Sequence, residues 1–161
     1  MTIRRTLPHR SAGFTLMELI VTLTILGILA SIAAPSFRDL MMDQRVKSAS
    51  FDMTAALILA RSEALKQNGS VTLAPSSGTT EWANGWTVTG PDGATIGTQG
   101  AYAASITITG PTSIVYNRSG RSSSATTVTV QVGSSMSGST VSPRCISVGV
   151  TGQPKSVKGG C

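Results

Sequence analysis

Gly13-Phe14-Thr15-Leu16-Met17-Glu18-Leu19 opens the stretch that decides the fold, an apolar run that continues to Ala34. The residues up to Gly13 include Arg4, Arg5 and Arg10 and no acid, and Glu18 is the only ionisable side chain in residues 14–34. A helix over this run spans about 30 Å, which matches the hydrocarbon core of a bilayer. A carboxylate inside hydrocarbon is costly, so the run predicts a membrane helix in which Glu18 needs a specific partner.

The start of the run resembles the processing site of type IV prepilins and of the pseudopilins of type II secretion. The likeness rests on Gly13-Phe14 followed by Glu18, with a basic leader before them and an apolar helix after them. It implies that a prepilin peptidase cuts after Gly13 and methylates the new N-terminus at Phe14. It also implies that the helix leaves the inner membrane for a filament of pilins or pseudopilins. There, Glu18 would pair with the N-terminus of a neighbouring subunit and set the assembly register.

Two ordinary membrane signals share part of this pattern. An uncleaved signal anchor is also basic and then apolar, and Ser31-Ile32-Ala33 fits the small-x-small site of ordinary signal peptidase. Neither signal explains Glu18 or the Gly-Phe junction, which favours the prepilin interpretation. The chain is then expected to divide into a cleaved leader (1–13), a transmembrane and assembly helix (14–35) and a globular head in the periplasm (36–161).

The composition of the chain is typical of a β-rich extracytoplasmic domain with many turns. The chain is 12% charged and 4% aromatic and contains 17 glycines, and the head has the length of one compact domain. The last acid is Asp92, and residues 93–161 carry bases only: Arg118, Arg121, Arg144, Lys155 and Lys158. This asymmetry favours an anionic partner, for which nucleic acid, anionic glycan and a phospholipid surface are all eligible.

Apolar periodicity predicts a helix followed by short strands. Pro35 is expected to kink or locally melt the helix, which then resumes over 36–67. Its core-facing side is predicted to hold Phe37, Leu40, Met41, Met53, Ala56, Leu57, Ala60 and Ala64. Period-two alternation predicts strands over 70–74, 85–89, 105–109, 113–117, 125–132 and 144–150, with a Ser-rich loop at 133–142. The expected class is α+β, with a long N-terminal helix packed on an antiparallel sheet, which resembles the pilin fold.

Later motifs resemble the FimT/GspH group of minor pilins and pseudopilins. The similar residues are Ala60-Arg61-Ser62-Glu63-Ala64, Trp82-Ala83-Asn84-Gly85-Trp86, and Cys145 with a late Thr151-Gly152 and Cys161. In DNA-uptake members of this group, a Gly-Arg-x-Arg pattern in the C-terminal tail carries DNA binding. This chain has Gly152-Gln153-Pro154-Lys155 at the matching place. The resemblance implies a minor pilin that binds double-stranded DNA without sequence specificity during natural transformation.

The C-terminal segment departs from that pattern in a way that weakens phosphate binding. Gln153 replaces a bidentate guanidinium with a neutral amide, and Lys155 supplies a point charge. Four further bases are candidates for the missing phosphate contacts: Arg118, Arg121, Arg144 and Lys158. The alternative is that all these bases are only solvated.

The two cysteines, Cys145 and Cys161, are expected to form a disulfide in an oxidising periplasm. The bridge would close a loop of about 17 residues and stabilise the head by about 3 kcal/mol. It would also pin a basic loop at both ends. Two free thiols are the alternative.

Catalysis is not supported by the sequence. The only histidine, His9, lies in the leader, the carboxylates are scattered, and phosphate-binding and nucleophile-elbow motifs are absent, so no enzyme, metal or cofactor is expected.

One rival function is that of a GspH-like pseudopilin of type II secretion. Another is a pilus-anchored glycan-binding adhesin, in which Trp82, Trp86 and Tyr102 stack on sugars. For the tryptophans themselves, we expect Trp86 in the core and Trp82 partly exposed.

Overall fold

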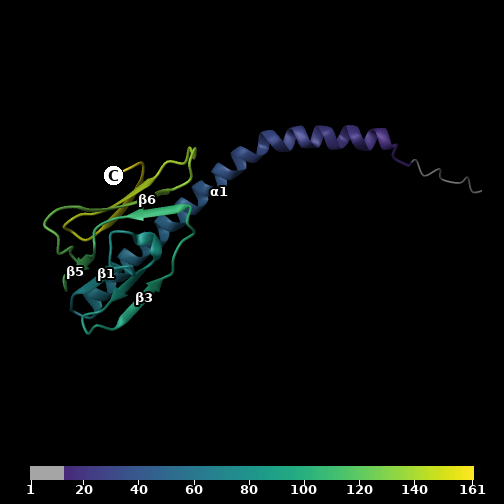
Figure 1. Ribbon diagram of the computed structural model, residues 1–161. Helices are drawn as coiled ribbons and strands as arrows, with labels where there is room; N and C mark the ends of the chain where they lie inside the picture. The colour runs from purple at the N-terminus through teal and green to yellow at the C-terminus, as the bar shows by residue number, and fades with distance from the viewer. Residues whose placement is uncertain (1–12) are drawn as a thin grey trace, which may run out of the picture. The chain divides into compact units, whose positions relative to one another are not determined.

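A computed structural model describes residues 13–161 of the chain (Figure 1). One helix, α1 (Leu16–Lys66), precedes eight strands and a short 3-10 helix, η1 (Trp82–Asn84). The chain divides into two compact units, Met1–Arg38 and Asp39–Cys161, and each is described by itself. His9 and the rest of the predicted leader before Gly13 lie outside the described residues.

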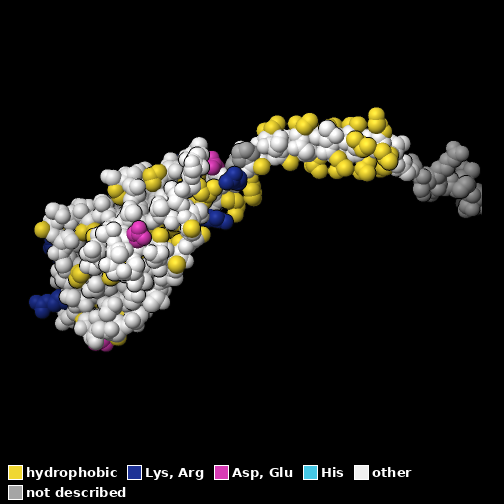
Figure 2. All heavy atoms as spheres, in the orientation of Figure 1, with side chains coloured by type: hydrophobic (Ala, Val, Ile, Leu, Met, Phe, Trp, Pro, Cys, Tyr) yellow, Lys and Arg dark blue, Asp and Glu magenta, His cyan; other side chains and the backbone are white. Residues whose placement is uncertain are grey.

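The described part of the first unit is an apolar helical segment. Figure 2 shows hydrophobic side chains along it, and by length and composition α1 is able to cross a membrane, with a mean hydropathy of 2.3 over its most apolar window. The hydroxyls of Thr22, Thr24 and Ser31 donate to carbonyls one turn earlier, which satisfies them without water. The prediction of local melting at Pro35 is wrong, because residues on both sides are helical. The lost hydrogen bond is a local defect in an otherwise intact ladder.

The second half of α1 packs its apolar stripe on the head. The buried residues recur at spacings of three and four: Met42, Val46, Ala49, Met53, Leu57, Ala60 and Ala64. This confirms the predicted face from Met53 onward, with Ala56 half-buried beside it. The prediction for Phe37, Leu40 and Met41 is wrong, since all three are exposed. Met42 and Val46 continue the register of Met53, and the neighbouring Met41 therefore points away from the core.

The head contains two antiparallel sheets of four strands each. The first has the order β3-β2-β1-β5, from β3 (Thr95–Gln99), β2 (Trp86–Thr89), β1 (Val71–Pro75) and β5 (Ile114–Tyr116). The second has the order β4-β6-β7-β8, from β4 (Ile106–Thr109), β6 (Val128–Ser134), β7 (Arg144–Val148) and β8 (Pro154–Lys158). Each predicted strand is present, β3 and β8 were not predicted, and β6 extends into the predicted Ser-rich loop.

Both tryptophans belong to the core. Trp86 is 2% exposed, as predicted, whereas Trp82 is fully buried, so the prediction of partial exposure is wrong. The indole Nε1 of Trp82 donates to the carbonyl of Pro111 at 2.8 Å. This hydrogen bond satisfies the polar atom and removes the usual reason for a tryptophan to reach solvent.

Four hydrogen bonds attach α1 to separate parts of the head, and the first joins the hydroxyl of Thr140, which donates, to Oδ2 of Asp39 at 2.6 Å. The hydroxyls of Ser50 and Ser156 on β8 lie 2.9 Å apart, and the hydroxyl of Tyr102 donates to the carboxylate of Asp52 at 2.8 Å. Nε of Arg61 donates to the carbonyl of Gly120 at 3.0 Å, in the turn after β5. All the buried core residues lie at or beyond Met42, so the Asp39–Cys161 unit contains its whole core.

Candidate functional site

The predicted processing site ends in a helix cap. Gly13 and Phe14 precede α1, and Phe14 is 77% exposed. The hydroxyl of Thr15 accepts the backbone N–H of Glu18 at 3.2 Å, and the Thr15 carbonyl accepts the N–H of Leu19 at 3.1 Å. Thr-x-x-Glu is the sequence of a capping box, a signal that the sequence predictions did not include. Glu18 therefore lies in the first helical turn, where a carboxylate also interacts favourably with the helix dipole.

The C-terminal segment is a strand rather than the predicted loop. β8 pairs with β7 along its whole length, from Val148 opposite Pro154 to Arg144 opposite Lys158. Proline is tolerated there because it is the first residue of an edge strand. The turn between the two strands is closed by the N–H of Gly152, which donates to the carbonyl of Gly149 at 2.8 Å.

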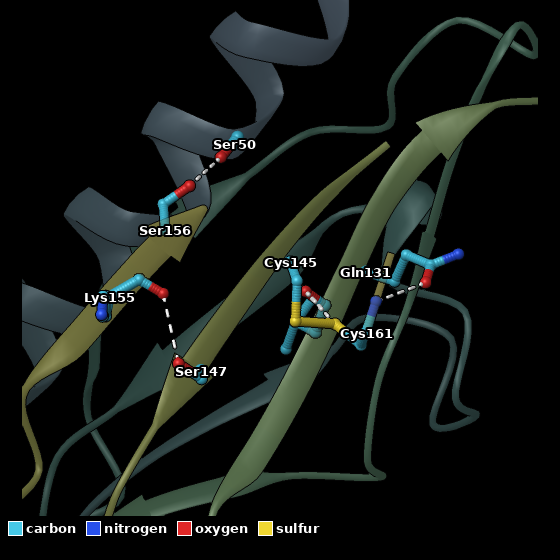
Figure 3. Close-up of a disulfide and its surroundings, with 8 residues drawn as sticks. Ser50, Gln131, Cys145, Ser147, Lys155, Ser156 and Cys161 are labelled. Atoms are coloured by element: carbon cyan, nitrogen blue, oxygen red, sulfur yellow. Dashed lines mark hydrogen bonds between the residues drawn. A yellow bond between two sulfur atoms is a disulfide. The ribbon is translucent and has the colours of Figure 1, made fainter. Parts of the chain in front are cut away.

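The predicted disulfide between Cys145 and Cys161 is present, with a Cα–Cα distance of 5.0 Å (Figure 3). The backbone N–H of Cys161 donates to Oε1 of Gln131 on β6 at 3.1 Å. The N–H of Gly159, just after β8, donates to the carbonyl of Pro143 at 2.8 Å. The residues that follow β8 are therefore tied to β6 and β7, so β8 is held at both ends.

Lys155 and Lys158 do not share a face. They lie three residues apart in β8, and successive side chains of a strand point to opposite sides of the sheet. Lys158 is instead the cross-strand partner of Arg144. The pKa of Asp43 on α1 is lowered mainly by a hydrogen bond from Lys47 at 2.7 Å, and the positive charges of Lys158 and Arg144 add to that effect. Arg144 and Lys158 thus lie close enough to α1 for their charges to contribute weakly at Asp43, whose ion-pair partner is Lys47.

The turn that carries Arg118 and Arg121 packs against the turn before β8. Oδ1 of Asn117 accepts the N–H groups of Ser119 and Arg121, at 2.9 and 3.1 Å, which shapes the first turn. Gly152 has a φ of +79°, and a Cβ built on it would overlap the carbonyl oxygen of Gly120. This close approach requires glycine at position 152.

Gln153 and Lys155 line a shallow groove of about 490 Å³, and the other residues that line it are Thr127, Ser147, Gly149, Thr151 and Pro154. We call Arg118, Arg121, Gln153 and Lys155 the basic end of the head. Both arginines and Lys155 are exposed, and none of them takes part in either ion pair found among residues 13–161. The structure thus separates the predicted bases into the basic end and the Arg144–Lys158 pair.

Comparison with known proteins identifies the family. The family model described as type II transport protein GspH matches residues 49–152, more than half of the chain. The chain belongs to the GspH family. The model of the prokaryotic N-terminal methylation motif matches residues 8–34 of this GspH-family protein and implies processing by a prepilin peptidase.

Known pilins share the fold and part of the sequence of this GspH-family chain. Two crystal structures of the type IV minor pilin FimU from Pseudomonas aeruginosa match with TM-scores of 0.60 and 0.59, at 20% and 19% identity. They cover 70% and 69% of this chain and 87% and 91% of FimU. The type IV narrow pilus major component PilA5 of Thermus thermophilus is 45% identical over 49 residues, which are 30% of this chain and 40% of that protein. The predicted resemblance and the α+β pilin fold are confirmed. The family and fold are those of structural pilins.

Replacing Gly152 with alanine is expected to destabilise the head by about 2 kcal/mol or more. An L-residue in the left-handed region costs about 1–2 kcal/mol, and overlap with the Gly120 carbonyl adds to this cost. Urea unfolding of the Asp39–Cys161 unit measures the loss. Gly149→Ala is the matched control, because a Cβ at Gly149 meets no atom within 4 Å. Equal stabilities of the two variants would contradict the packing of the two turns.

Proposed function

We propose that this protein is a minor subunit of a type IV pilus or related filament, and that its basic end contacts the phosphate backbone of double-stranded DNA. The GspH family, the methylation motif and the likeness to the minor pilin FimU support the filament role. In this proposal the chain is processed after Gly13, methylated at Phe14 and held in the bacterial inner membrane by residues 14–35. The head then faces the periplasm until the subunit enters the filament.

The observation that carries the DNA contact is the packing of Gly152 on the Arg118–Arg121 turn. It brings the turn that carries Arg118 and Arg121 against the turn that leads into Gln153 and Lys155, although the two turns lie far apart in the sequence. A guanidinium binds phosphate through two parallel hydrogen bonds, which Gln153 is unable to do. Arg118 and Arg121 therefore supply the forked donors that the C-terminal tail itself lacks.

Such contacts are electrostatic and independent of base sequence. Each base that neutralises a phosphate releases a counterion, so affinity falls as salt rises. Residues 93–161 contain no acid, which leaves this end of the head without the carboxylates that would repel DNA from within the same segment. Arg144 and Lys158 are left out of the DNA contact in this proposal. Lys158 shares a face of β8 with Ser156, which hydrogen-bonds to Ser50 of α1, and Arg144 is its cross-strand partner.

The proposal is tested by measuring DNA affinity as a function of salt. The full chain in detergent is titrated against a labelled duplex, and the slope of log affinity against log salt is compared with that of Arg118→Gln/Arg121→Gln/Lys155→Gln. We expect the variant to lose up to about three units of slope, since each phosphate contact contributes about 0.9. A duplex of unrelated sequence should bind the native chain equally well. Native slope and affinity in the triple variant would overturn the assignment of the basic end.

A second candidate is a pseudopilin of type II secretion, which the description of the matching family model favours. Deletion of the gene separates the two functions: loss of DNA uptake with normal protein secretion supports the pilus, and the opposite result supports the secretion system.

The glycan-binding alternative finds no support in the head. Both tryptophans are buried, and Tyr102 stacks on Trp86 with ring centroids 5.8 Å apart, so these rings form no open platform for a sugar.

A further inference from the structure

Three of the four edge strands in the head are protected against pairing with another chain. β4 forms a bridge through Thr109 to Glu81, and β5 accepts the N–H of Ser123 at the Val115 carbonyl, 2.8 Å away. β8 begins with a proline and carries two lysines, which are common guards of an exposed edge.

β3 is the least protected of the four edge strands. Its sequence, Thr-Ile-Gly-Thr-Gln, contains neither a charge nor a proline, and its pairing within residues 13–161 is to β2 only. The register of that pairing shifts between Val88 and Thr89, which leaves Ile96 as a bulge, whereas Gly97–Gln99 pairs regularly. An edge of this kind presents a row of backbone donors and acceptors to any extended chain. The regular part of this edge, residues 97–99, is therefore a candidate surface for strand addition.

A largely apolar groove of about 370 Å³ runs beside β3, between this strand and α1. Leu59 lines it from the helix, and Val88 and Gly97 line it from the sheet. A Cβ on Gly97 would lie 3.3 Å from Cδ2 of Leu59, so the absent side chain leaves the groove open. Glycine within a strand often marks the place where another backbone approaches closely.

Asp52 supplies the groove with one carboxylate. Its Oδ2 accepts the Tyr102 hydroxyl at 2.8 Å, and Oδ1 has no hydrogen-bond partner among the described side chains. Burial and this hydrogen bond raise the pKa of Tyr102, so the phenol remains the donor. A segment that binds in this apolar groove is therefore expected to carry a cationic group that pairs with the Asp52 carboxylate.

We propose that β3 accepts an extended segment of another protein as an additional strand of the first sheet. Apolar side chains at alternate positions fill the groove beside Leu59 and Gly97, and a basic side chain pairs with Asp52. Asp52 and Leu59 lie about 10 Å apart along the helix, and alternate residues of a strand repeat every 7 Å or so. The partner is thus a strand with two apolar residues and a lysine or arginine on the same face.

A peptide whose sequence reads the same in both directions tests this proposal whether the added strand lies parallel or antiparallel to β3. Labelled Lys-Thr-Val-Thr-Val-Thr-Lys is titrated against the full chain in detergent, and amide hydrogen exchange is followed for Thr95–Gln99. We expect saturable binding and slower exchange in β3, with β4 unchanged. Gly97→Val should weaken binding about tenfold by filling the groove, and Gly149→Val, at a site without neighbours within 4 Å, should bind as the native chain does.

A second variant, the nearly isosteric Asp52→Asn, tests the proposal even if Gly97→Val fails to fold. The native chain should bind the lysine peptide more tightly than Glu-Thr-Val-Thr-Val-Thr-Glu, and Asp52→Asn should reduce that preference severalfold. Unchanged exchange in β3, or native affinity in Gly97→Val, would overturn the proposal. Slower exchange in β3 that appears without peptide and grows with protein concentration would also overturn it, because the occupant would then be a second copy of this chain.

Discussion

Glu18→Ala is expected to leave membrane insertion intact and to prevent incorporation into filaments. In the proposed assembly, the carboxylate of Glu18 compensates the buried N-terminal ammonium of a neighbouring subunit. Removing one member of a buried ion pair costs about 3–5 kcal/mol, which corresponds to a fall of about a hundredfold or more in incorporation. Immunoblots of sheared filaments and of the membrane fraction measure the two pools separately.

The helix cap makes a control necessary for this experiment. Thr15 accepts the N–H of Glu18, so a substitution at position 18 also touches the start of the helix. Thr15→Ala removes the cap, at a cost of about 1 kcal/mol, and leaves the carboxylate in place. We expect Thr15→Ala subunits to enter filaments. Equal exclusion of both variants would show that helix capping is the cause, and normal incorporation of Glu18→Ala would refute the pairing role.

Trp82→Ala is expected to destabilise the head by about 3–5 kcal/mol, a large part of the 5–15 kcal/mol that is typical of a domain. The side chain is fully buried, and its truncation also leaves the Pro111 carbonyl without its donor. Urea unfolding of the Asp39–Cys161 unit measures the loss. Trp82→Phe keeps most of the apolar volume and should cost clearly less. A loss below about 1 kcal/mol in Trp82→Ala would show that Trp82 is a surface residue.

Local patterns in the sequence predicted the elements that carry strong local signals. The apolar run to Ala34 gave the helical segment, and period-two alternation gave six strands of the head, because a half-buried strand must alternate. β3 was not predicted, because Ile96 is its only large apolar residue and Gly97 interrupts the alternation of apolar and polar residues. β8 was predicted as a loop, because glycines, a proline and lysines are typical of loops. Its pairing with β7 and the disulfide hold it as a strand instead.

The errors in side-chain orientation arose where neighbouring residues are equally apolar. Leu40, Met41 and Met42 all suit a core, and only the packing of the whole helix selects Met42. Trp82 is buried because a carbonyl from Pro111, distant in the sequence, accepts its indole N–H. Patterns within one segment do not contain such partners.

The candidate site was predictable in its residues but not in its grouping. Charge counting found all five bases of residues 93–161, since they follow the last acid. Their division depends on strand alternation in β8, which places Lys155 and Lys158 on opposite faces, and on the contact of Gly152 with Gly120. The contact joins two turns that are far apart in the chain, so only the fold reveals it.

Two variants that remove the same charge from the full chain distinguish the basic end from the Arg144–Lys158 pair as the DNA contact. Arg118→Gln/Arg121→Gln takes two positive charges from the basic end, and Arg144→Gln/Lys158→Gln takes two from the cross-strand pair. The salt dependence of duplex DNA binding is measured for both. We expect the first variant to lose up to about two units of slope and the second to keep the native slope. Equal losses in the two variants, or a loss confined to the second, would contradict the assignment of DNA contact to the basic end.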